Sequence, residues 1–319
     1  MTEKKRISVA MALYQGDEFL EEQLRSICEQ TLPPDEIVLC DDAPGAHTTD
    51  IIERTRARWN TIDIRYRVNP RRLGVDRNFA SAIAECTGEI IFLSDQDDVW
   101  LPEKIRLLAD AVGEGGAFCN STAVDGSLKP LGYSHWEMRE FAPIPDAELL
   151  FEFFLRRVPA AGHNMAFNAK WKELLLPLPG LFHCHDSWIG SMIAAVAGWQ
   201  VIDRELTLYR VHDKNLSRPR RPGLIQQWEA AREAIRTNAS GWTAELLYEL
   251  LLRCDVMDQT VDPRRRALIL SRIRHARARE DLSDKMLPRL PIIAREYLSG
   301  NYGRWGRGWR NALQDLFLR

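Results

Sequence analysis

The first half of the chain alternates short apolar runs with segments in which apolar residues recur every three to four positions. The short runs are nearly continuous, which is typical of strands buried on both faces of a sheet, and the recurring positions are typical of amphipathic helices. Strands are predicted over Ile7–Leu13, Glu36–Cys40, 62–68 and Glu89–Ser94, and helices over 17–28, 48–59, Val75–Cys86 and Pro102–Val112. We therefore expect an α/β fold with a mostly parallel sheet covered by helices on both faces.

Paired acids follow two of these strands. Asp41 and Asp42 end one strand, and Asp95, Asp97 and Asp98 follow another. Ligands of parallel sheets bind at the carboxyl ends of the strands, where these acids are expected to meet. Close carboxylates repel one another unless a cation or hydrogen-bond donors lie between them, and Mg²⁺ prefers carboxylates together with phosphate oxygens. As an alternative, acids are common in turns, and Asp98 could cap the helix that follows.

Five ordered motifs give the chain a family resemblance from about residue 7 to residue 217. They are ISVAMALYQGDEFLEEQLRSICEQ, IVLCDDA, NPRRLGVDRNFASAIAECTGEIIFLSDQDDVW, HDSWIG and YRVHDKNLS. In this order they resemble the inverting family 2 glycosyltransferases, which have a Rossmann-like GT-A fold. The SDQDDVW and YRVHDKNLS segments are most similar to rhamnosyltransferase-like members that act on bacterial surface polysaccharides.

The resemblance implies a nucleotide-sugar site at the first two strands and at the D-x-D motif. Ala12, through its backbone, and Tyr14 would line the base and ribose pocket. Asp41 or Asp42 would hydrogen-bond the pyrimidine, and Asp95 would lie near the ribose. The family's usual proline-threonine at the end of the first strand is replaced here by alanine and leucine, which weakens any assignment of the base.

The resemblance also implies a metal and a general base. Asp97 would bind Mg²⁺ or Mn²⁺ at the donor diphosphate, His212 would approach that metal or the diphosphate, and Asp186 would be the base. This chemistry suits the residue types, because a metal stabilises a leaving diphosphate and a carboxylate can take the proton of an attacking hydroxyl. Arg77 is a candidate phosphate contact. Two alternatives stay open: Asp186 could only cap the helix that follows it, and His212 could be a surface histidine.

Composition restricts the cellular setting. The six cysteines show no C-x-x-C spacing, so they are interpreted as small buried residues of a reducing compartment. His163, Cys184 and its two flanking histidines match no zinc pattern well. The N-terminus lacks the features of a signal peptide, and no run reaches the roughly 18 apolar residues that span a bilayer. The chain is therefore expected to be cytoplasmic, either soluble or peripheral at the inner face of the plasma membrane.

The charges divide the chain into two parts. Residues 1–219 carry 24 Lys and Arg against 33 Asp and Glu, whereas residues 220–319 carry 19 against 12. We expect a catalytic domain over 1–219 and a basic, helical region over 220–319 whose last helices mix aromatic residues with arginines. Such a mixture is typical of contact with an anionic membrane, and the alternative is packing against the catalytic domain or a second copy of the chain in a homodimer. The acidic first part and the lack of a binding motif argue against nucleic acid.

Taken together, these features predict a metal-dependent inverting glycosyltransferase. It would move a sugar from dTDP-rhamnose or a UDP-sugar to a hydroxyl of a polysaccharide or lipid-linked acceptor. The alternative is a catalytically degenerate carbohydrate-binding or scaffold protein on the same fold, which intact Asp97, Asp186 and His212 disfavour.

Overall fold

The computed structural model describes residues 5–180, 185–212, 229 and 232–318. These residues form two compact units, which we treat separately. The α/β unit comprises residues 1–150 and 159–219, and the helical unit comprises residues 151–158 and 220–319. The short segment 151–158, which the sequence analysis placed in the first domain, thus belongs to the helical unit.

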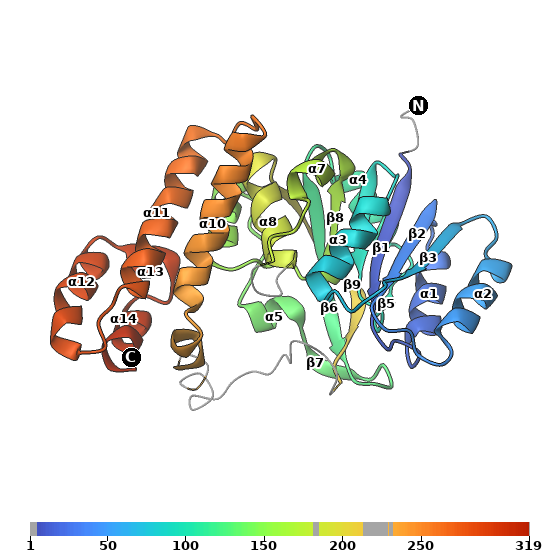
Figure 1. Cartoon of the computed structure of the whole chain (residues 1–319), viewed down its shortest axis with the longest axis horizontal. Coiled ribbons are helices and arrows are strands. Elements are labelled where there is room, and N and C mark those ends of the chain that lie inside the picture. The colour runs from blue at the N-terminus through green and yellow to red at the C-terminus, as the bar shows by residue number, and fades with distance from the viewer. Residues whose placement is uncertain (1–4, 181–184, 213–228, 230–231, 319) are drawn as a thin grey trace. The chain divides into compact units, whose positions relative to one another are not determined.

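The α/β unit is built on one mixed sheet of nine strands with the order β3-β2-β1-β4-β8-β6-β9-β5, and β7 pairs with β6 at its side (Figure 1). The strands are β1 (Ile7–Leu13), β2 (Glu36–Asp41), β3 (Asp63–Val68), β4 (Ile90–Ser94), β5 (Val99–Trp100), β6 (Gly116–Val124), β7 (Pro130–Ser134), β8 (Met165–Asn168) and β9 (Trp199–Arg210). β1 to β4 pair in parallel, as predicted. β8 then runs antiparallel between β4 and β6, so the second half of the sheet is mixed.

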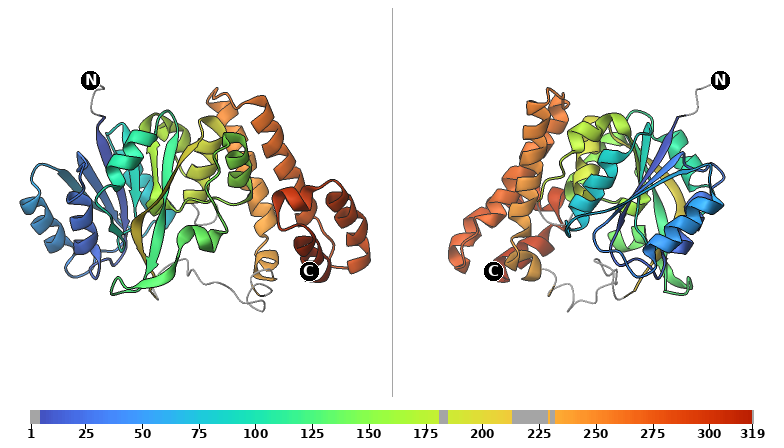
Figure 2. Two further views of the ribbon diagram at one scale, coloured as in Figure 1. Left: turned by 180° about the vertical axis from the view of Figure 1, so that it is seen from behind. Right: turned by 45° about the vertical axis from the view of Figure 1, so that its right-hand side comes forward.

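Helices cover both faces of this sheet, as predicted (Figures 1 and 2). The helices of the α/β unit are α1 (Leu20–Cys28), α2 (Thr48–Arg58), α3 (Val75–Glu85), α4 (Lys104–Ala111), α5 (His135–Arg139), α7 (Lys172–Leu175) and α8 (His185–Val196), and α6 (Ala147–Arg156) leads into the helical unit. Successive strand residues point to opposite faces. Val9 and Met11 of β1 accordingly share a buried cluster with Leu24 of α1 and Leu108 of α4. α3 packs on β1, β2 and α8.

The predicted helix start at Asp17 is wrong, and the residue has another use. α1 begins at Leu20 after Phe19, with no side-chain cap. The Asp17 carboxylate instead accepts hydrogen bonds from His47 N (2.8 Å) and Thr48 Oγ1 (2.5 Å) at the start of α2. Asp17 therefore caps the next helix along the chain. A local pattern cannot reveal this, because the partner lies thirty residues away.

The helical unit contains no strand in its described part, in agreement with the prediction. Its helices are α10 (Ala239–Val256), α11 (Pro263–Glu280), α12 (Met286–Leu298), α13 (Asn301–Trp305) and α14 (Trp309–Phe317). α10 and α11 pack along each other as a hairpin, and Asp262 caps α11 by accepting hydrogen bonds from Arg264 N and Arg265 N. Leu282, Ile293, Tyr302 and Ala312 form a small core. Among the described helices, none combines the length and apolarity needed to span a bilayer.

Candidate active site

The two residues predicted to bind the metal lie together. Asp97 follows β4 in the turn before β5, and His212 lies two residues beyond the end of β9. Asp97 Oδ2 and His212 Nε2 are 2.9 Å apart, and each side chain keeps 16% of its surface exposed. Two elements more than one hundred residues apart in sequence thus present a carboxylate and an imidazole at one solvent-accessible point.

Arg210 fixes this arrangement. As the last residue of β9, it donates from its backbone N to Asp98 Oδ1 (3.0 Å) and from Nε to the carbonyl oxygen of Asp97 (2.8 Å). Its Nη2 pairs with Glu22, and its guanidinium lies 4.4 Å from the ring centre of Phe19. Sequence reasoning gave Arg210 no role, although it lies within the YRVHDKNLS motif. Its buried guanidinium ties the end of β9 to the acidic turn and so places His212.

Behind the turn lies a group that we call the charged cluster: Asp95, Asp98, Lys104 and His163. Asp98, Lys104 and His163 are buried, whereas the Asp95 side chain keeps 38% of its surface exposed. His163 Nδ1 is 3.4 Å from Asp95 Oδ2 and 3.7 Å from Asp98 Oδ2. Ligand atoms of the two acids and the histidine all lie within 4.8 Å of one another. Lys104 Nζ donates to the carbonyl oxygen of His163 (2.5 Å) and to Thr207 Oγ1 (2.8 Å). Neither Lys104 nor His163 belongs to a motif with recognisable spacing. His163 was considered only for a zinc cluster, and no pattern indicated that either residue contacts the acidic turn.

Burial shifts the ionisation of the charged cluster. It raises the pKa of Asp98 to about 7, because the carboxyl is desolvated and lies near Asp97 and Asp95, while the charge of His163 opposes the shift. Burial also lowers the pKa of Lys104 to about 8. For His163, desolvation disfavours the charged form, yet the nearby Asp98 and Asp95 raise its pKa overall. Desolvation likewise opposes charge on Asp95, but its bond to His163 lowers the pKa.

Asp98 does not cap the following helix, so that alternative is wrong. α4 begins at Lys104, and its N-cap residue is Glu103. Asp98 is fully buried, and its Oδ2 accepts no hydrogen bond from any described residue. The carboxylate is therefore directed into the charged cluster rather than along the helix.

The two acids at the end of β2 lie in different environments. Asp41 is fully buried and accepts hydrogen bonds from Tyr66 OH (3.0 Å) and Ala43 N (3.0 Å). Desolvation raises the pKa of Asp41, although both bonds oppose this. Asp42 keeps 8% of its surface exposed and accepts from Asn69 Nδ2 (2.8 Å) and Gly74 N (2.7 Å). Of the two acids that the sequence could not separate, only Asp42 retains exposed surface.

The end of β1 is joined to the acidic turn. Ala12 lies in β1 opposite Cys40 of β2, and Tyr14 follows the strand with 38% of its surface exposed. Gln96 Oε1 accepts from Tyr14 N (2.8 Å), and Gln96 Nε2 donates to the carbonyl oxygen of Tyr14 (3.0 Å). The guanidinium of Arg72 stacks 4.3 Å from the Tyr14 ring centre. The variable position of the D-x-D motif therefore links the predicted ribose end of the site to its predicted metal end.

The predicted base lies in the first turn of α8. Asp186 Oδ1 accepts a hydrogen bond from Ser187 N (2.7 Å). Because α8 begins at His185, Asp186 lies within its first turn and does not cap a helix that begins at Ser187, so the capping alternative is wrong. The bond from Ser187 N occupies one oxygen and leaves the other available. The preceding residues 181–184, which include Cys184 of the considered zinc cluster, lie outside the described residues.

His185 directly precedes Asp186, the predicted base. Its backbone N and its ring Nδ1 both lie near Asp76 Oδ1, at 3.0 and 3.3 Å, and its ring stacks on Phe79. Desolvation opposes the charged form, but Asp76 and the charges of Asp186 and Asp95 raise the pKa of His185 overall. Its buried Nε2 has no hydrogen-bond partner within the described residues. The charge of His185 therefore acts on the predicted base and on the predicted ribose contact at once.

Arg77, the predicted phosphate contact, is exposed near the start of α3. A Cβ added to Gly180 would lie 3.6 Å from its Nη2, so the guanidinium reaches the segment that precedes Asp186. Within the described ranges it forms no ion pair. The cation is thus available to an anionic ligand, but its surroundings do not by themselves indicate one.

Comparisons with known proteins show the family and the fold of the chain. The family model for glycosyl transferase family 2 matches residues 8–174, just over half of the chain. The dTDP-rhamnosyl transferase RfbG of Shigella flexneri is 29% identical over 220 residues, which cover 64% of this chain and 72% of RfbG.

Two solved structures share the fold. TarS 1-349 of S. aureus matches with a TM-score of 0.54 and 16% identity, covering 96% of this chain and 90% of that one. The mannosyltransferase PcManGT from Pyrobaculum calidifontis, in complex with GDP-Man and Mn²⁺, matches with a TM-score of 0.51 and 17% identity, covering 99% and 86%. The family match, together with the predicted fold, shows that the chain belongs to glycosyl transferase family 2 and is a glycosyltransferase.

Proposed function

We propose that this protein transfers a sugar from a nucleotide-sugar donor to a hydroxyl of a polysaccharide or lipid-linked acceptor, with inversion at the anomeric carbon. The observation that carries the proposal is the meeting of Asp97 and His212 beside the predicted donor contacts. The similarity to a dTDP-rhamnosyl transferase favours dTDP-rhamnose as donor, and a UDP-sugar is the second candidate.

A divalent cation, Mg²⁺ or Mn²⁺, fits the donor set of Asp97 and His212. Both side chains are partly exposed, whereas the charged cluster behind them already contains the Lys104 ammonium, which would repel a second cation. The GT-A neighbour from Pyrobaculum calidifontis is in complex with Mn²⁺, which supports a metal in this fold. When bound, the ion would stabilise the negative charge that develops on the leaving diphosphate.

The donor nucleotide would lie along the ends of β1 and β2. Both carboxylates accept two hydrogen bonds from the protein, but Asp42 retains exposed surface and Asp41 has none, so Asp42 is the better candidate for a hydrogen bond to the pyrimidine. The backbone of Ala12 and the exposed ring of Tyr14 would line the base and ribose pocket. Asp95 would accept from a ribose hydroxyl while its other contact, to His163, keeps it ionised.

Asp186 would act as general base. One of its oxygens is held by Ser187 N, which orients the carboxylate at the start of α8 and leaves the second oxygen for the acceptor hydroxyl. Proton removal makes that hydroxyl a competent nucleophile during attack. A single displacement of this kind needs no covalent intermediate with the protein, and it inverts the anomeric carbon.

The experiment that tests the proposal is a transfer assay with dTDP-rhamnose and UDP-sugars in which release of the nucleoside diphosphate is measured. We expect Asp97→Asn and Asp186→Asn each to lower the rate by about 100-fold or more, as for the loss of a group that acts in the transition state. Asp110→Asn is the matched control, because Asp110 is an exposed aspartate on α4 whose ion-pair partner is Arg106 and not a residue of the site. Unchanged transfer in both site variants, with intact circular dichroism, would refute the assignment.

The same assay tests the alternative that the protein is a catalytically degenerate binding or scaffold protein. A carbohydrate-binding or scaffold protein on this fold would bind sugar without releasing nucleotide from any donor. Nucleotide release that depends on Mg²⁺ or Mn²⁺ and on Asp97 would remove that alternative.

We further propose that the protein is cytoplasmic and binds peripherally to the inner face of the plasma membrane through its helical unit. On α14, Trp309, Leu313 and Phe317 are largely exposed, as a membrane contact would require. Tyr302 and Trp305 are buried, so this part of the aromatic sequence packs against protein instead. Sedimentation with phosphatidylglycerol vesicles tests the membrane contact, and loss of sedimentation in Trp309→Ala would support it. A homodimer remains the alternative use of the exposed residues, and light scattering would detect it.

A further inference from the structure

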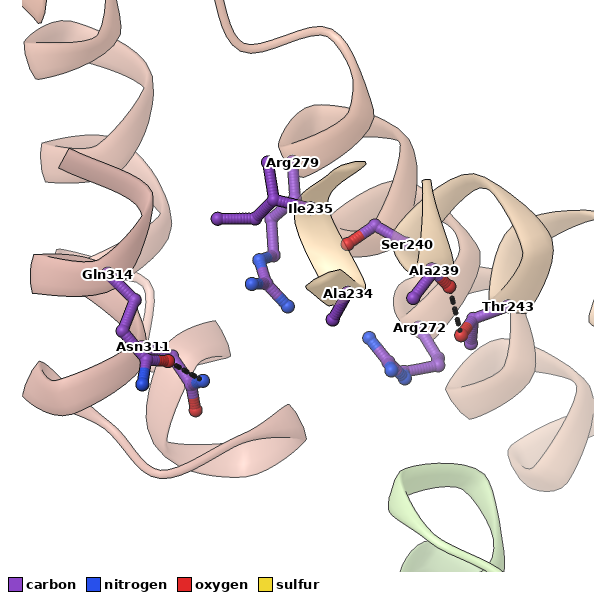
Figure 3. A pocket seen from close by; sticks show the side chains of 9 residues that line it. All are labelled: Ala234, Ile235, Ala239, Ser240, Thr243, Arg272, Arg279, Asn311 and Gln314. Carbon is purple, nitrogen blue, oxygen red and sulfur yellow. Dashed lines mark hydrogen bonds between the residues drawn. The ribbon is translucent and has the colours of Figure 1, made fainter. Parts of the chain in front are cut away.

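A basic cavity lies within the helical unit. It has a volume of about 220 Å³. Six of the side chains that line it are polar or charged: Ser240, Thr243, Arg272, Arg279, Asn311 and Gln314. Figure 3 shows the guanidinium groups of Arg272 and Arg279 and the hydroxyl of Ser240 directed toward the same space. No carboxylate is among the described residues that line it.

Arg272 is the central residue of this cavity. It lies on α11 with 7% of its surface exposed, so it is more than nine-tenths buried. Its Nε donates to the carbonyl oxygen of Leu155 (3.1 Å), but within the described part of the chain its two terminal nitrogens have no hydrogen-bond partner and it forms no salt bridge. Buried charges in proteins are normally paired, so a buried guanidinium without a carboxylate calls for an anion.

Arg279, which also lines the cavity, differs from Arg272 in having a carboxylate partner. Arg279 lies two turns further along α11 and forms a bidentate ion pair with Asp315, through Nε (2.6 Å) and Nη2 (2.9 Å). The charge of Arg279 is therefore compensated within the protein. Besides burial, the positive charges of Arg279 and Arg156 lower the pKa of Arg272 to about 9. The cavity thus contains one guanidinium, that of Arg272, whose charge is not compensated by a carboxylate of the described residues.

The remaining lining groups add donors at the rim. The hydroxyl of Ser240 and the amide nitrogen of Gln314 have no partner among the described residues, whereas the Gln314 carbonyl already accepts from Asn311 Nδ2 (3.0 Å). Ser240 lies in the first turn of α10, an 18-residue helix, where the helix dipole favours negative charge. Among the described residues, each group without a partner in the cavity can therefore donate a hydrogen bond to an anion.

We infer that this cavity binds a phosphate group. A planar guanidinium such as that of Arg272 matches two phosphate oxygens, and the Ser240 hydroxyl and Gln314 amide can donate to the others. The volume corresponds to about seven water molecules at roughly 30 Å³ each, which accommodates a phosphate or a diphosphate. It lies below the roughly 300 Å³ at which pockets for drug-sized ligands begin, so a whole nucleotide-sugar is not expected there.

Inorganic phosphate and pyrophosphate are the probes for a titration of the full-length protein by calorimetry in a chloride buffer. The Asp97→Asn background with EDTA suppresses metal-dependent binding at the donor site, so the result does not depend on the proposed transfer activity. We expect Arg272→Gln to weaken phosphate binding by about tenfold or more, as for the loss of charge-assisted hydrogen bonds. Arg274→Gln is the matched control, because Arg274 is exposed on the same helix outside the cavity.

Ser240→Asp provides a second variant that does not depend on removing a buried residue. A carboxylate at this rim position is favourable for α10, and it should weaken phosphate binding by a similar factor by occupying the cavity with negative charge. Undiminished phosphate binding in either variant would overturn the inference, as would the absence of binding to the parent protein. Vesicles of phosphatidylglycerol against phosphatidylcholine then identify the source: Arg272-dependent sedimentation indicates a lipid headgroup, and binding of soluble phosphate alone indicates a free phosphate group.

Discussion

Two buried aspartates, one in each unit, differ in how completely their carboxylates are hydrogen-bonded. Asp315 in the helical unit is fully buried and accepts hydrogen bonds from Arg279 Nε, Arg279 Nη2 and Tyr302 OH. Asp98 in the α/β unit is equally buried, but its Oδ2 accepts no hydrogen bond from the described residues and lies 3.7 Å from His163 Nδ1. The first carboxylate is satisfied by a complete set of donors, and the second is not.

The difference separates a structural charge from one at a candidate functional site. An ion pair with complete hydrogen bonding offsets the desolvation of its members and holds α11 and α14 in a fixed register. The charged cluster around Asp98 instead contains polar groups with incomplete hydrogen bonding, at the carboxyl end of β4. Groups with perturbed pKa values are common in active sites. The two aspartates should therefore respond differently to the same isosteric substitution.

The largest effect is expected for Asp315→Asn. The substitution removes the charge that compensates Arg279, and breaking a buried pair by removing one partner typically costs about 3–5 kcal/mol. Urea unfolding followed by far-UV circular dichroism measures the change, with Tyr302→Phe as a control that should cost only about 1 kcal/mol. An unaltered unfolding midpoint for Asp315→Asn would contradict a stabilising role of the ion pair between Asp315 and Arg279.

A smaller, pH-dependent effect is expected for Asp98→Asn. The folded pKa of Asp98, about 7, lies above the ordinary value of 3.8, so the folded state holds this proton more tightly than the unfolded chain. The stability that this proton contributes is present at low pH and is lost as pH rises from about 4 to 7. Asp98→Asn lacks this loss, so its stability relative to the parent protein should improve by about 1 kcal/mol or more between pH 5 and pH 8. Parallel pH profiles of the two proteins would contradict the assignment.

The smallest effect is expected for an exposed ion pair. Arg266 forms two 2.7 Å hydrogen bonds with Asp255, which looks as regular as the pair of Arg279 with Asp315. Both side chains are well exposed, at 38% and 52%, so solvent screens the attraction. Arg266→Gln should change the free energy of unfolding by less than about 0.5 kcal/mol. A larger loss in urea unfolding would mean that geometry, and not burial, determines the contribution of such pairs.

The sequence predicted the parallel part of the fold well. Ile7–Leu13 is a strand as predicted, because an apolar run of that length is buried on both faces of the sheet. The antiparallel insertion of β8 between β4 and β6 could not be predicted, since its four residues Met165–Asn168 carry no signal for their partner strands or their direction. Strand order in the second half of the sheet depends on long-range packing and not on local periodicity.

The site was predictable where a motif concentrates several residues. Asp97 and His212 were named from such motifs, and the fold places them in contact. Lys104 begins α4, and His163 lies in a short 3-10 turn, Gly162–Asn164, before β8. Both are single residues in otherwise ordinary segments, and only tertiary packing brings them to Asp98. The structure also distinguishes Asp41 from Asp42 by burial, which adjacent residues in a sequence cannot reveal.

The hydrogen bonds between Gln96 and Tyr14 fix the distance between the two ends of the proposed donor site. They join the loop after β1, where the ribose is expected, to the turn that carries Asp97, where the diphosphate is expected. Gln96→Ala should therefore raise the KM for the donor more than it lowers kcat, which steady-state kinetics would show. Because the two loops are held at a set separation, a donor with a single phosphate would reach one end of the site without reaching the other. The length of the donor's phosphate linkage, as well as its base and sugar, would then be a criterion by which the protein selects its substrate.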